Sequence, residues 1–253
     1  MIRMADAALE AGFVVHRFNL RGCGGTEFLA PTFCHGGLTA DLLSYLLRLD
    51  RDRRTPVYLI GFSLGGNIAL KLAGELGEDG DRLLAGVCAA SAPVDLEASA
   101  RRLAAPANRL YQWRLLRGLR RRLELVHRAV PDLWPIDGLG QVRSLLEFDA
   151  RFTAPRHGFE SAEQYYRTQS AAAFLPEIRV PALIVHAKDD PIVPFRQFEH
   201  TALAGNPAIT LVAPDSGGHL GFLSWKSPRF WLPATVIAWI LEKEQELGGG
   251  TVS

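Results

Sequence analysis

The sequence predicts an α/β protein built on a mostly parallel sheet that helices cover on both faces. Short runs rich in Val, Ile, Leu and Phe alternate along the chain with segments of helical periodicity. The strand-like runs are almost continuously apolar, as expected for strands that are buried on both faces. With 253 residues, 48 % of them hydrophobic and 22 % charged, the chain can build a large core, which excludes a disordered protein.

The expected elements follow one another in a regular order. A helix over residues 1–11 opens the chain. The strand-like runs are Phe13–Phe18, Val57–Ile60, Leu83–Ala90, Ala182–His186 and, more weakly, Ala208–Ala213. The helix-like segments are Leu38–Leu49, Leu64–Leu76, Phe195–Ala204 and Pro233–Leu241. Because the strands are parallel, their carboxyl ends meet at one edge, where α/β proteins bind ligands.

One long region lacks strand-like runs and shows helical patterns interrupted by prolines. Within it, an apolar stripe at helical spacing consists of Leu116, Leu119, Leu123 and Val126. We therefore expect three parts: 1–94 as the first part of the α/β core, 95–175 as a helical cap insertion, and 176–253 as the second part of the core. An insertion at this position is expected to lie over the carboxyl ends of the strands.

The sharpest motif is Gly61-Phe62-Ser63-Leu64-Gly65, which stands between the strand Val57–Ile60 and the helix Leu64–Leu76. A serine on a tight strand-to-helix turn is exposed as a nucleophile, and the helix N-terminus supplies free amides beside it. The Leu64 amide is the expected oxyanion donor, because it directly follows the nucleophile. The alternative is a structural turn that happens to expose a serine.

A serine needs a base, and the base needs a carboxylate that orients it. His219 lies in a glycine-rich loop after the strand Ala208–Ala213, and we assign it as the base. Asp189 and Asp190 both follow the strand Ala182–His186. We favour Asp190 as the acid, with Asp189 as a turn residue that binds backbone amides. Two further histidines, His35 and His157, are candidates for contact with substrate.

Several other classes of protein are excluded. Asn67 stands where a phosphate-binding P-loop needs lysine, and Glu27 stands where a dinucleotide fingerprint needs its third glycine. The net charge of +1 predicts no nucleic-acid partner. Three scattered cysteines favour a reducing compartment over a disulfide framework or zinc cluster. No targeting or membrane-spanning segment is predicted, so we expect a cytoplasmic protein. We expect no metal or cofactor, because a serine with its base and acid generates its own nucleophile.

Charge is nevertheless distributed unevenly. The segment from Arg101 to Arg128 holds nine arginines and one acid, Glu124, which gives it a net charge of +8. The simplest interpretation is a solvated helical face. The alternative is weak contact between the arginine-rich cap and an anionic membrane surface, for which Trp113, Leu115, Leu116 and Leu119 would supply apolar contacts unless they pack the cap onto the core.

The chain resembles the α/β-hydrolase superfamily, and within it the YheT-like branch of predicted esterases. The resemblance is carried by NLRGCGGTE (19–27), GFSLGGNIALK (61–71), SAPVDL (91–96), FDARFTAPRHGF (148–159), HAKDDPIVP (186–194) and SGGHLGF (216–222). It implies a serine hydrolase of carboxylic esters with the triad Ser63, Asp190 and His219. The family's early strands and the His-Gly loop that supplies an oxyanion donor are absent before Ser63, so we expect an N-terminally incomplete fold.

Three functions therefore stay open. The leading one is cleavage of a small-molecule acyl ester through an acyl-enzyme. Because the missing loop would cost an oxyanion donor, the second is a non-catalytic binding protein on the same fold. The third is an alcohol O-acyltransferase, which shares the acyl-enzyme and differs in its acceptor.

Overall fold

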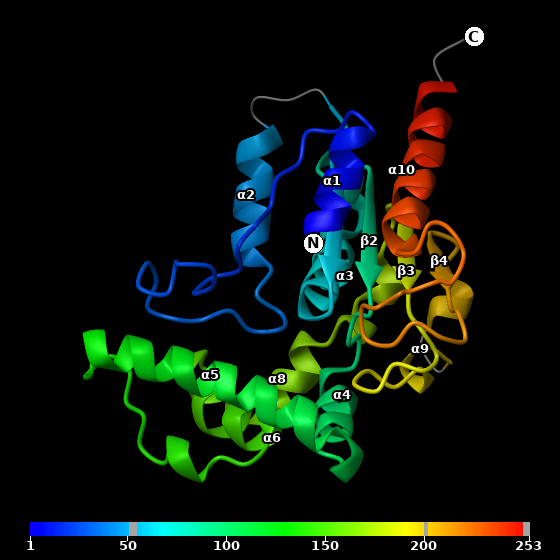
Figure 1. Cartoon of the computed structure of the whole chain (residues 1–253). Helices are drawn as coiled ribbons and strands as arrows, with labels where there is room; N and C mark the ends of the chain where they lie inside the picture. Colours follow the sequence, from blue (N-terminus) through cyan, green and yellow to red (C-terminus); the bar gives the residue numbers. More distant parts are fainter. Residues whose placement is uncertain (51–54, 200–201, 250–253) are drawn as a thin grey trace.

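A computed structural model describes residues 1–50, 55–199 and 202–249, and its sheet has four strands (Figure 1). The strands are β1 (Tyr58–Phe62), β2 (Gly86–Ala90), β3 (Ala182–Val185) and β4 (Ile209–Val212). They lie in sequence order and every neighbouring pair is parallel. The carboxyl ends of all four strands therefore share one edge of the sheet, as the α/β class predicts.

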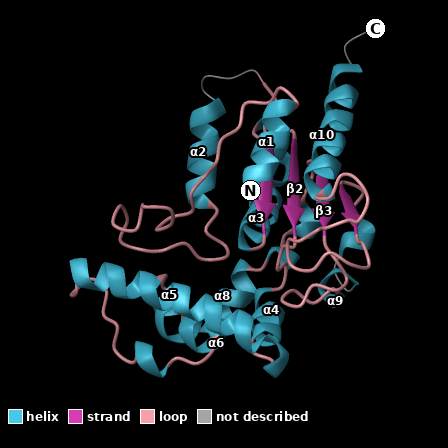
Figure 2. Ribbon diagram, in the orientation of Figure 1, coloured by secondary structure: helices cyan, strands magenta, loops and turns pink. Residues whose placement is uncertain are grey.

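Helices cover both faces of this sheet (Figure 2). Val87 and Ile184 point to one face, whereas Cys88 and Val185 point to the other, and all four are buried. The first face is covered by α2 (Ala40–Asp50), α3 (Leu64–Leu76) and the short α9 (Arg196–Glu199), and the second by α1 (Ile2–Glu10) and α10 (Trp231–Gly249). Burial from both sides explains why β2 and β3 are continuously apolar.

Helical structure is present in every segment where it is expected, although several bounds differ from the prediction. Helix α3 has the bounds that the sequence predicts, and α10 extends beyond the expected Pro233–Leu241 at both ends. The expected helix Phe195–Ala204 corresponds to α9 and a 3₁₀ turn at Ala202–Gly205, while residues 200 and 201 lie outside the described part. None of the described helices has the length and apolar character needed to cross a membrane.

The expected strand Phe13–Phe18 is wrong: the segment has no regular secondary structure. A strand must exchange backbone hydrogen bonds with a neighbour about 4.8 Å away. Here a cavity of about 270 Å³ lies between the segment and β1, and both line its walls. Phe13, Val15 and Phe18 still pack on the core, so the apolar pattern marks burial even though the pairing is absent.

The chain between β2 and β3 forms a helical layer beside the carboxyl edge of the sheet (Figure 1). Its helices are α4 (Leu96–Leu103), α5 (Arg109–Ala129), α6 (Leu145–Phe148), α7 (Ala154–Arg156) and α8 (Ala162–Gln169), with a π-helical turn at Asp149–Thr153. Leu116, Leu123 and Val126 are buried against Trp134, and Leu119 is half-buried beside them, as the apolar stripe predicts. The exact division at residues 95 and 175 stays a prediction.

Candidate active site

Ser63 lies at the turn between β1 and α3. Its backbone has φ 48° and ψ −123°, in the left-handed range of φ that residues with a side chain rarely adopt. The Ser63 N–H donates to the Ala90 carbonyl oxygen at 2.9 Å, which fixes the turn against the end of β2. The strained turn projects the Ser63 side chain from the carboxyl edge of the sheet.

Small residues around the turn are required at two positions. A Cβ at Gly61 would lie 2.3 Å from the Gly65 carbonyl oxygen, and one at Gly66 would lie 2.8 Å from the Ala92 Cβ. At Gly65 a Cβ would meet no atom within 4 Å among the described residues. The close approach of β1, α3 and the chain after β2 thus explains why positions 61 and 66 need glycine, but it gives no such reason for Gly65.

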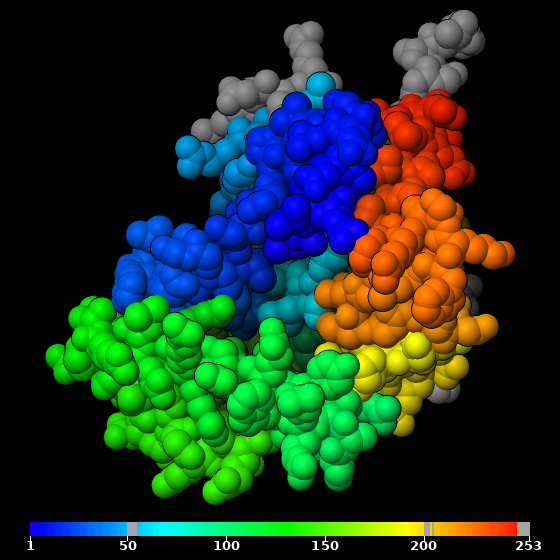
Figure 3. All heavy atoms as spheres, viewed as in Figure 1, coloured from blue at the N-terminus to red at the C-terminus, as the bar shows by residue number. Residues whose placement is uncertain are grey.

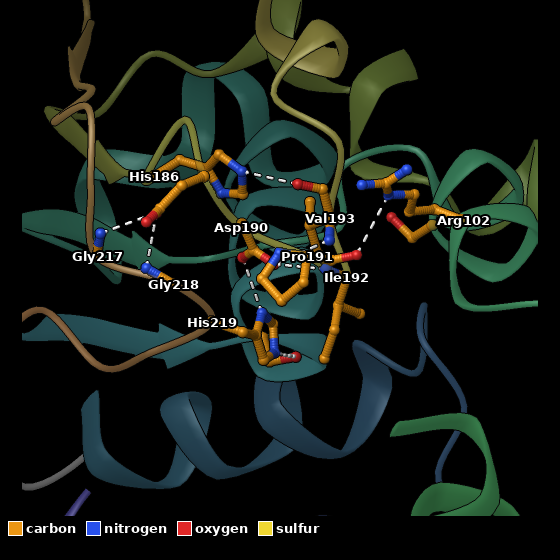
Figure 4. A network of polar contacts seen from close by, with 12 residues as sticks. Arg102, His186, Asp190, Pro191, Ile192, Val193, Gly217, Gly218 and His219 are labelled. Carbon is orange, nitrogen blue, oxygen red and sulfur yellow. Dashed lines mark hydrogen bonds and ion pairs between the residues drawn. The ribbon is translucent and has the colours of Figure 1, made fainter. Parts of the chain in front are cut away.

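Three side chains from three strand ends form a hydrogen-bonded series. Ser63 Oγ is 3.0 Å from His219 Nε2, and His219 Nδ1 is 2.8 Å from Asp190 Oδ2. Figure 4 shows His219 next to Asp190, below the chain that follows β3. With Nδ1–H donating to the carboxylate, Nε2 is left free to accept a proton from the serine.

Asp190 is held by more than His219. Its other carboxylate oxygen accepts hydrogen bonds from the backbone N–H groups of Ile192 at 2.8 Å and Val193 at 3.0 Å (Figure 4). Burial alone would raise the pKa of Asp190, but the hydrogen bond and charge of His219, together with the two amides, hold that pKa below its ordinary value. The carboxyl is therefore ionised at neutral pH.

Asp189 serves the histidine loop in another way. Its Oδ1 accepts hydrogen bonds from the N–H groups of Gly217 and Gly218, both at 2.8 Å. Asp189 binds backbone amides as expected of a turn residue, although they belong to a loop 28 positions further along the chain. The two adjacent acids thus have different roles. Asp190 holds the His219 ring, whereas Asp189 holds the backbone of the loop that carries His219.

The Leu64 amide is the first of α3 and lies beside Ser63. The N–H groups of the first turn of a helix have no acceptor within the helix, and no described residue accepts a hydrogen bond from Leu64 N–H. This amide is available to an oxygen atom that develops negative charge next to Ser63.

Ser63 opens into a cavity of about 390 Å³ whose other walls come mainly from the cap helices and from residues 20–35. His35 and His157 both line it, with their ring centroids 4.5 Å apart. Burial lowers the pKa of His35 to about 3 and also lowers that of His157, so both rings are neutral at neutral pH. Within the described ranges, no three His, Cys, Asp or Glu side chains are grouped as metal ligands.

The cavity also contains a buried acid that sequence reasoning missed. Asp149 accepts hydrogen bonds from the Tyr166 hydroxyl at 2.7 Å and the Thr153 hydroxyl at 2.6 Å. Burial raises the pKa of Asp149 to about 6, because hydroxyl donors compensate the lost hydration only in part. The acid lies in the 148–159 block that carries the family resemblance, but its pairing with Tyr166 has no signal in the spacing.

The side chain of Asn67 connects three parts of the site. Its side-chain amide donates to the carbonyl oxygens of Gly36 at 2.7 Å and Gln169 at 2.9 Å, and its oxygen accepts from Ala171 N–H at 2.8 Å. The fully buried Asn67 therefore joins the first turn of α3, the loop with His35, and the chain after α8.

A parallel α/β sheet with a serine on a strand-to-helix turn, followed along the chain by an acid and a histidine, is the arrangement of α/β hydrolases. A family model described as the alpha/beta hydrolase fold matches residues 1–224. The chain therefore belongs to the α/β-hydrolase family.

Two curated proteins are similar to this chain over most of its length. The YheT protein of Escherichia coli is 32 % identical over 243 residues, covering 94 % of this chain and 70 % of YheT. The monoacylglycerol lipase of Saccharomyces cerevisiae is 33 % identical over 230 residues, covering 85 % of this chain. The chain spans only 49 % of that lipase, about half its length.

Solved structures agree on the fold. The esterase Pf2001 of Pyrococcus furiosus superposes with a TM-score of 0.59 at 15 % identity, over 96 % of this chain and 75 % of that one. The mouse alpha/beta hydrolase domain-containing protein 10 has a TM-score of 0.53 at 17 % identity, over 95 % and 83 % of the two chains. At these identities the likeness concerns the fold alone.

Proposed function

We propose that this chain hydrolyses carboxylic esters, with Ser63 as nucleophile, His219 as general base and acid, and Asp190 as the carboxylate that orients His219. The observation that carries the proposal is the 3.0 Å contact between Ser63 Oγ and His219 Nε2, with Asp190 behind the ring. Family membership and the esterase and lipase names of the two relatives, at 32 % and 33 % identity, support the same reaction class.

The proposed reaction proceeds through an acyl-enzyme. His219 Nε2 accepts the Ser63 proton as Oγ attacks the ester carbonyl, and the Leu64 N–H donates to the resulting oxyanion. His219 then gives the proton to the leaving alcohol. Water, activated by the same imidazole, releases the acid and restores Ser63. Asp190 stays ionised throughout and stabilises the imidazolium.

The walls of the cavity favour an acyl chain as the occupant. Leucine side chains of α4 and α5 and the rings of Phe148 and Phe152 face it. We place the acyl chain against this apolar wall, and we assign residues 95–175 the role of a cap that sets chain length. His35 and His157, neutral and inside the cavity, would contact substrate without adding charge.

The test is hydrolysis of p-nitrophenyl esters by the wild type and by Ser63→Ala. Loss of the nucleophile is expected to lower kcat by at least about 10⁴-fold. Ser44→Ala, which removes an exposed hydroxyl on α2, is the matched control and should keep the full rate. Equal rates for Ser63→Ala and the wild type would leave the non-catalytic binding protein as the function.

The same assay separates hydrolysis from acyl transfer. With ethanol added, an alcohol O-acyltransferase would accumulate the ethyl ester, whereas a hydrolase would release the free acid. We expect the acid to predominate.

A second function, contact with an anionic membrane surface, is favoured by the outer face of α5. Leu110 is 73 % exposed and Trp113 55 % exposed, whereas Leu116 is buried and Leu119 lines the cavity. The exposed arginines of this helix, which make no ion pair with any described residue, are Arg109, Arg114, Arg117, Arg121 and Arg128. Figure 3 shows the cap as an outer part of the molecule. We propose that this face meets anionic lipid headgroups.

Co-sedimentation with vesicles tests this contact. Vesicles of phosphatidylcholine with phosphatidylglycerol should bind the protein, and phosphatidylcholine alone should not. Arg117→Glu with Arg121→Glu should abolish binding. Arg48→Glu with Arg82→Glu changes the charge equally at exposed positions outside the cap and should not affect binding. Absence of sedimentation at low salt would leave a solvated face.

A further inference from the structure

Two cysteines that are eleven positions apart in sequence come together in the cavity wall. The sulfur atoms of Cys23 and Cys34 are 3.7 Å apart, and both residues line the cavity that contains Ser63. Both are half-buried free thiols, whereas Cys88 is buried inside the sheet. The chain thus places two thiols in mutual contact where small molecules have access.

The backbone around the two thiols is fixed independently of their contact. The Cys34 N–H donates to the Arg21 carbonyl oxygen at 2.9 Å, and the Arg21 guanidinium donates to the Thr32 hydroxyl at 2.7 Å. Cys23 and Cys34 therefore stand at the base of a loop that is closed by other hydrogen bonds. Forming a covalent bond between the sulfurs requires a small local movement, not a rearrangement of the fold.

The surroundings also favour reactivity at one of the two sulfurs. Contact with the Cys34 thiol lowers the pKa of Cys23 to about 6. The positive charge of Arg122 also lowers it, whereas burial and Glu27 raise it. The same contact raises the pKa of Cys34. The pair consists of a thiolate that can attack and a thiol that can follow.

We propose that Cys23 and Cys34 form a site of reversible oxidation by hydroperoxides, whose disulfide reshapes the cavity next to Ser63. The Cys23 thiolate attacks the peroxide O–O bond and becomes a sulfenic acid, while the peroxide leaves as alcohol or water. The Cys34 sulfur then displaces hydroxide from the Cys23 sulfur and loses its proton, and hydroxide and proton leave as water. Two thiols and one hydroperoxide give one disulfide, one alcohol and one water.

The disulfide would act on the cavity through the residues beside Cys34. Phe33 and His35 flank it, and both line the cavity. Phe33 is stacked on Trp134 with a centroid distance of 4.3 Å, and His35 contacts the His157 ring. Pulling the Cys34 sulfur to within about 2.05 Å of Cys23 displaces this wall. This consequence rests on the proposed ester hydrolysis, whereas formation of the disulfide does not.

Mass spectrometry tests the site without reference to activity. The wild-type protein is treated with hydrogen peroxide, its free thiols are alkylated, and it is digested without reduction. The expected product is a pair of peptides joined through Cys23 and Cys34. Its mass is that of the two free peptides less two hydrogen atoms, and dithiothreitol should restore the free peptides. Cys88→Ser should give the same product, and Cys34→Ser should give none. Sulfinic acid at Cys23 with Cys34 still free, or a link to Cys88, would overturn the proposal.

Kinetics then test the link to the cavity. Oxidised wild-type protein should hydrolyse p-nitrophenyl octanoate several-fold more slowly than the reduced protein, and dithiothreitol should restore the rate. Cys34→Ser should show no such change under the same brief treatment. A disulfide that forms with no change in rate would refute the effect on the cavity while leaving ester hydrolysis intact.

Discussion

Two buried carboxyl groups, one in the sheet-edge site and one in the cap, are held in opposite ways. Asp190 receives two backbone amides and a histidine, and its pKa is lowered. Asp149 receives two hydroxyl groups, and burial raises its pKa to about 6. Asp190 is 5 % exposed and Asp149 is 7 % exposed, so burial alone does not distinguish them.

The partners of a buried acid decide its charge. Amide N–H groups directed at a carboxylate, together with a histidine that can become positive, stabilise the ionised form. Hydroxyl groups can rotate and serve a protonated carboxyl as well as an ionised one. The sheet edge therefore holds a permanent anion, whereas the cap holds an acid that is half protonated near pH 6.

The largest expected effect comes from replacing Asp190, the carboxyl group at the sheet edge. Asp190→Asn should lower kcat for ester hydrolysis by about 10⁴-fold, because an orienting carboxylate fixes the imidazole tautomer. Asp149→Asn, assayed at the same pH, should lower kcat by less than about 10²-fold, which is the smallest loss expected when a general acid or base is removed. Steady-state kinetics on both variants would decide, and similar losses would contradict the division of roles.

The next effect concerns stability and pH. Because the folded state raises the pKa of Asp149 from 3.8 to about 6, it binds a proton more tightly than the unfolded chain. Protonation of Asp149 therefore adds up to about 3 kcal/mol to the free energy of unfolding. This contribution is present below about pH 4 and is lost as the pH rises to about 6. Asp149→Asn cannot titrate and should lack this loss.

Urea unfolding at about pH 4 and about pH 7 measures the difference, since the two pH values lie on either side of the titration. The exposed Asp137→Asn is the control and should follow the wild type. If Asp149→Asn and the wild type changed in parallel, the raised pKa of Asp149 would be refuted.

The smallest expected effect comes from removing one hydrogen-bond donor to Asp149 in the cap. Tyr166→Phe removes the hydroxyl that donates to Asp149 Oδ2 at 2.7 Å, and should lower the free energy of unfolding by about 1 kcal/mol at neutral pH. Because that donor stabilises the carboxylate, its loss should also move the titration of Asp149 to higher pH. Tyr111→Phe removes an exposed hydroxyl on α5 and should change neither quantity.

The sequence predicts the sheet-edge residues because each follows a strand. Ser63, Asp190 and His219 lie in the segments that follow three apolar runs, and parallel strands bring their carboxyl ends together whatever the detailed packing. The structure places the His219 ring within hydrogen-bonding distance of both Ser63 and Asp190. Connectivity alone therefore locates this half of the site.

The rest of the site depends on contacts that sequence spacing does not encode. Asp149 meets Tyr166 through a π-helical turn, and Cys23 meets Cys34 through a loop with glycines at its start. The expected strand Phe13–Phe18 failed for a related reason, since strand formation depends on a partner and not on composition alone. Local pattern predicts burial in each case, but pairing is a property of the folded chain.

Asn67 has a consequence for how the cap moves. Its three hydrogen bonds end on the loop with His35, on the carbonyl of Gln169 and on the amide of Ala171. Lifting the cap from the sheet would break the two bonds to Gln169 and Ala171 and leave the buried Asn67 oxygen without a donor, so the first turn of α3 and the base of the cap open together or not at all. Hydrogen exchange at the Ala171 amide should accordingly report the free energy of one cooperative unit that includes the turn presenting Ser63.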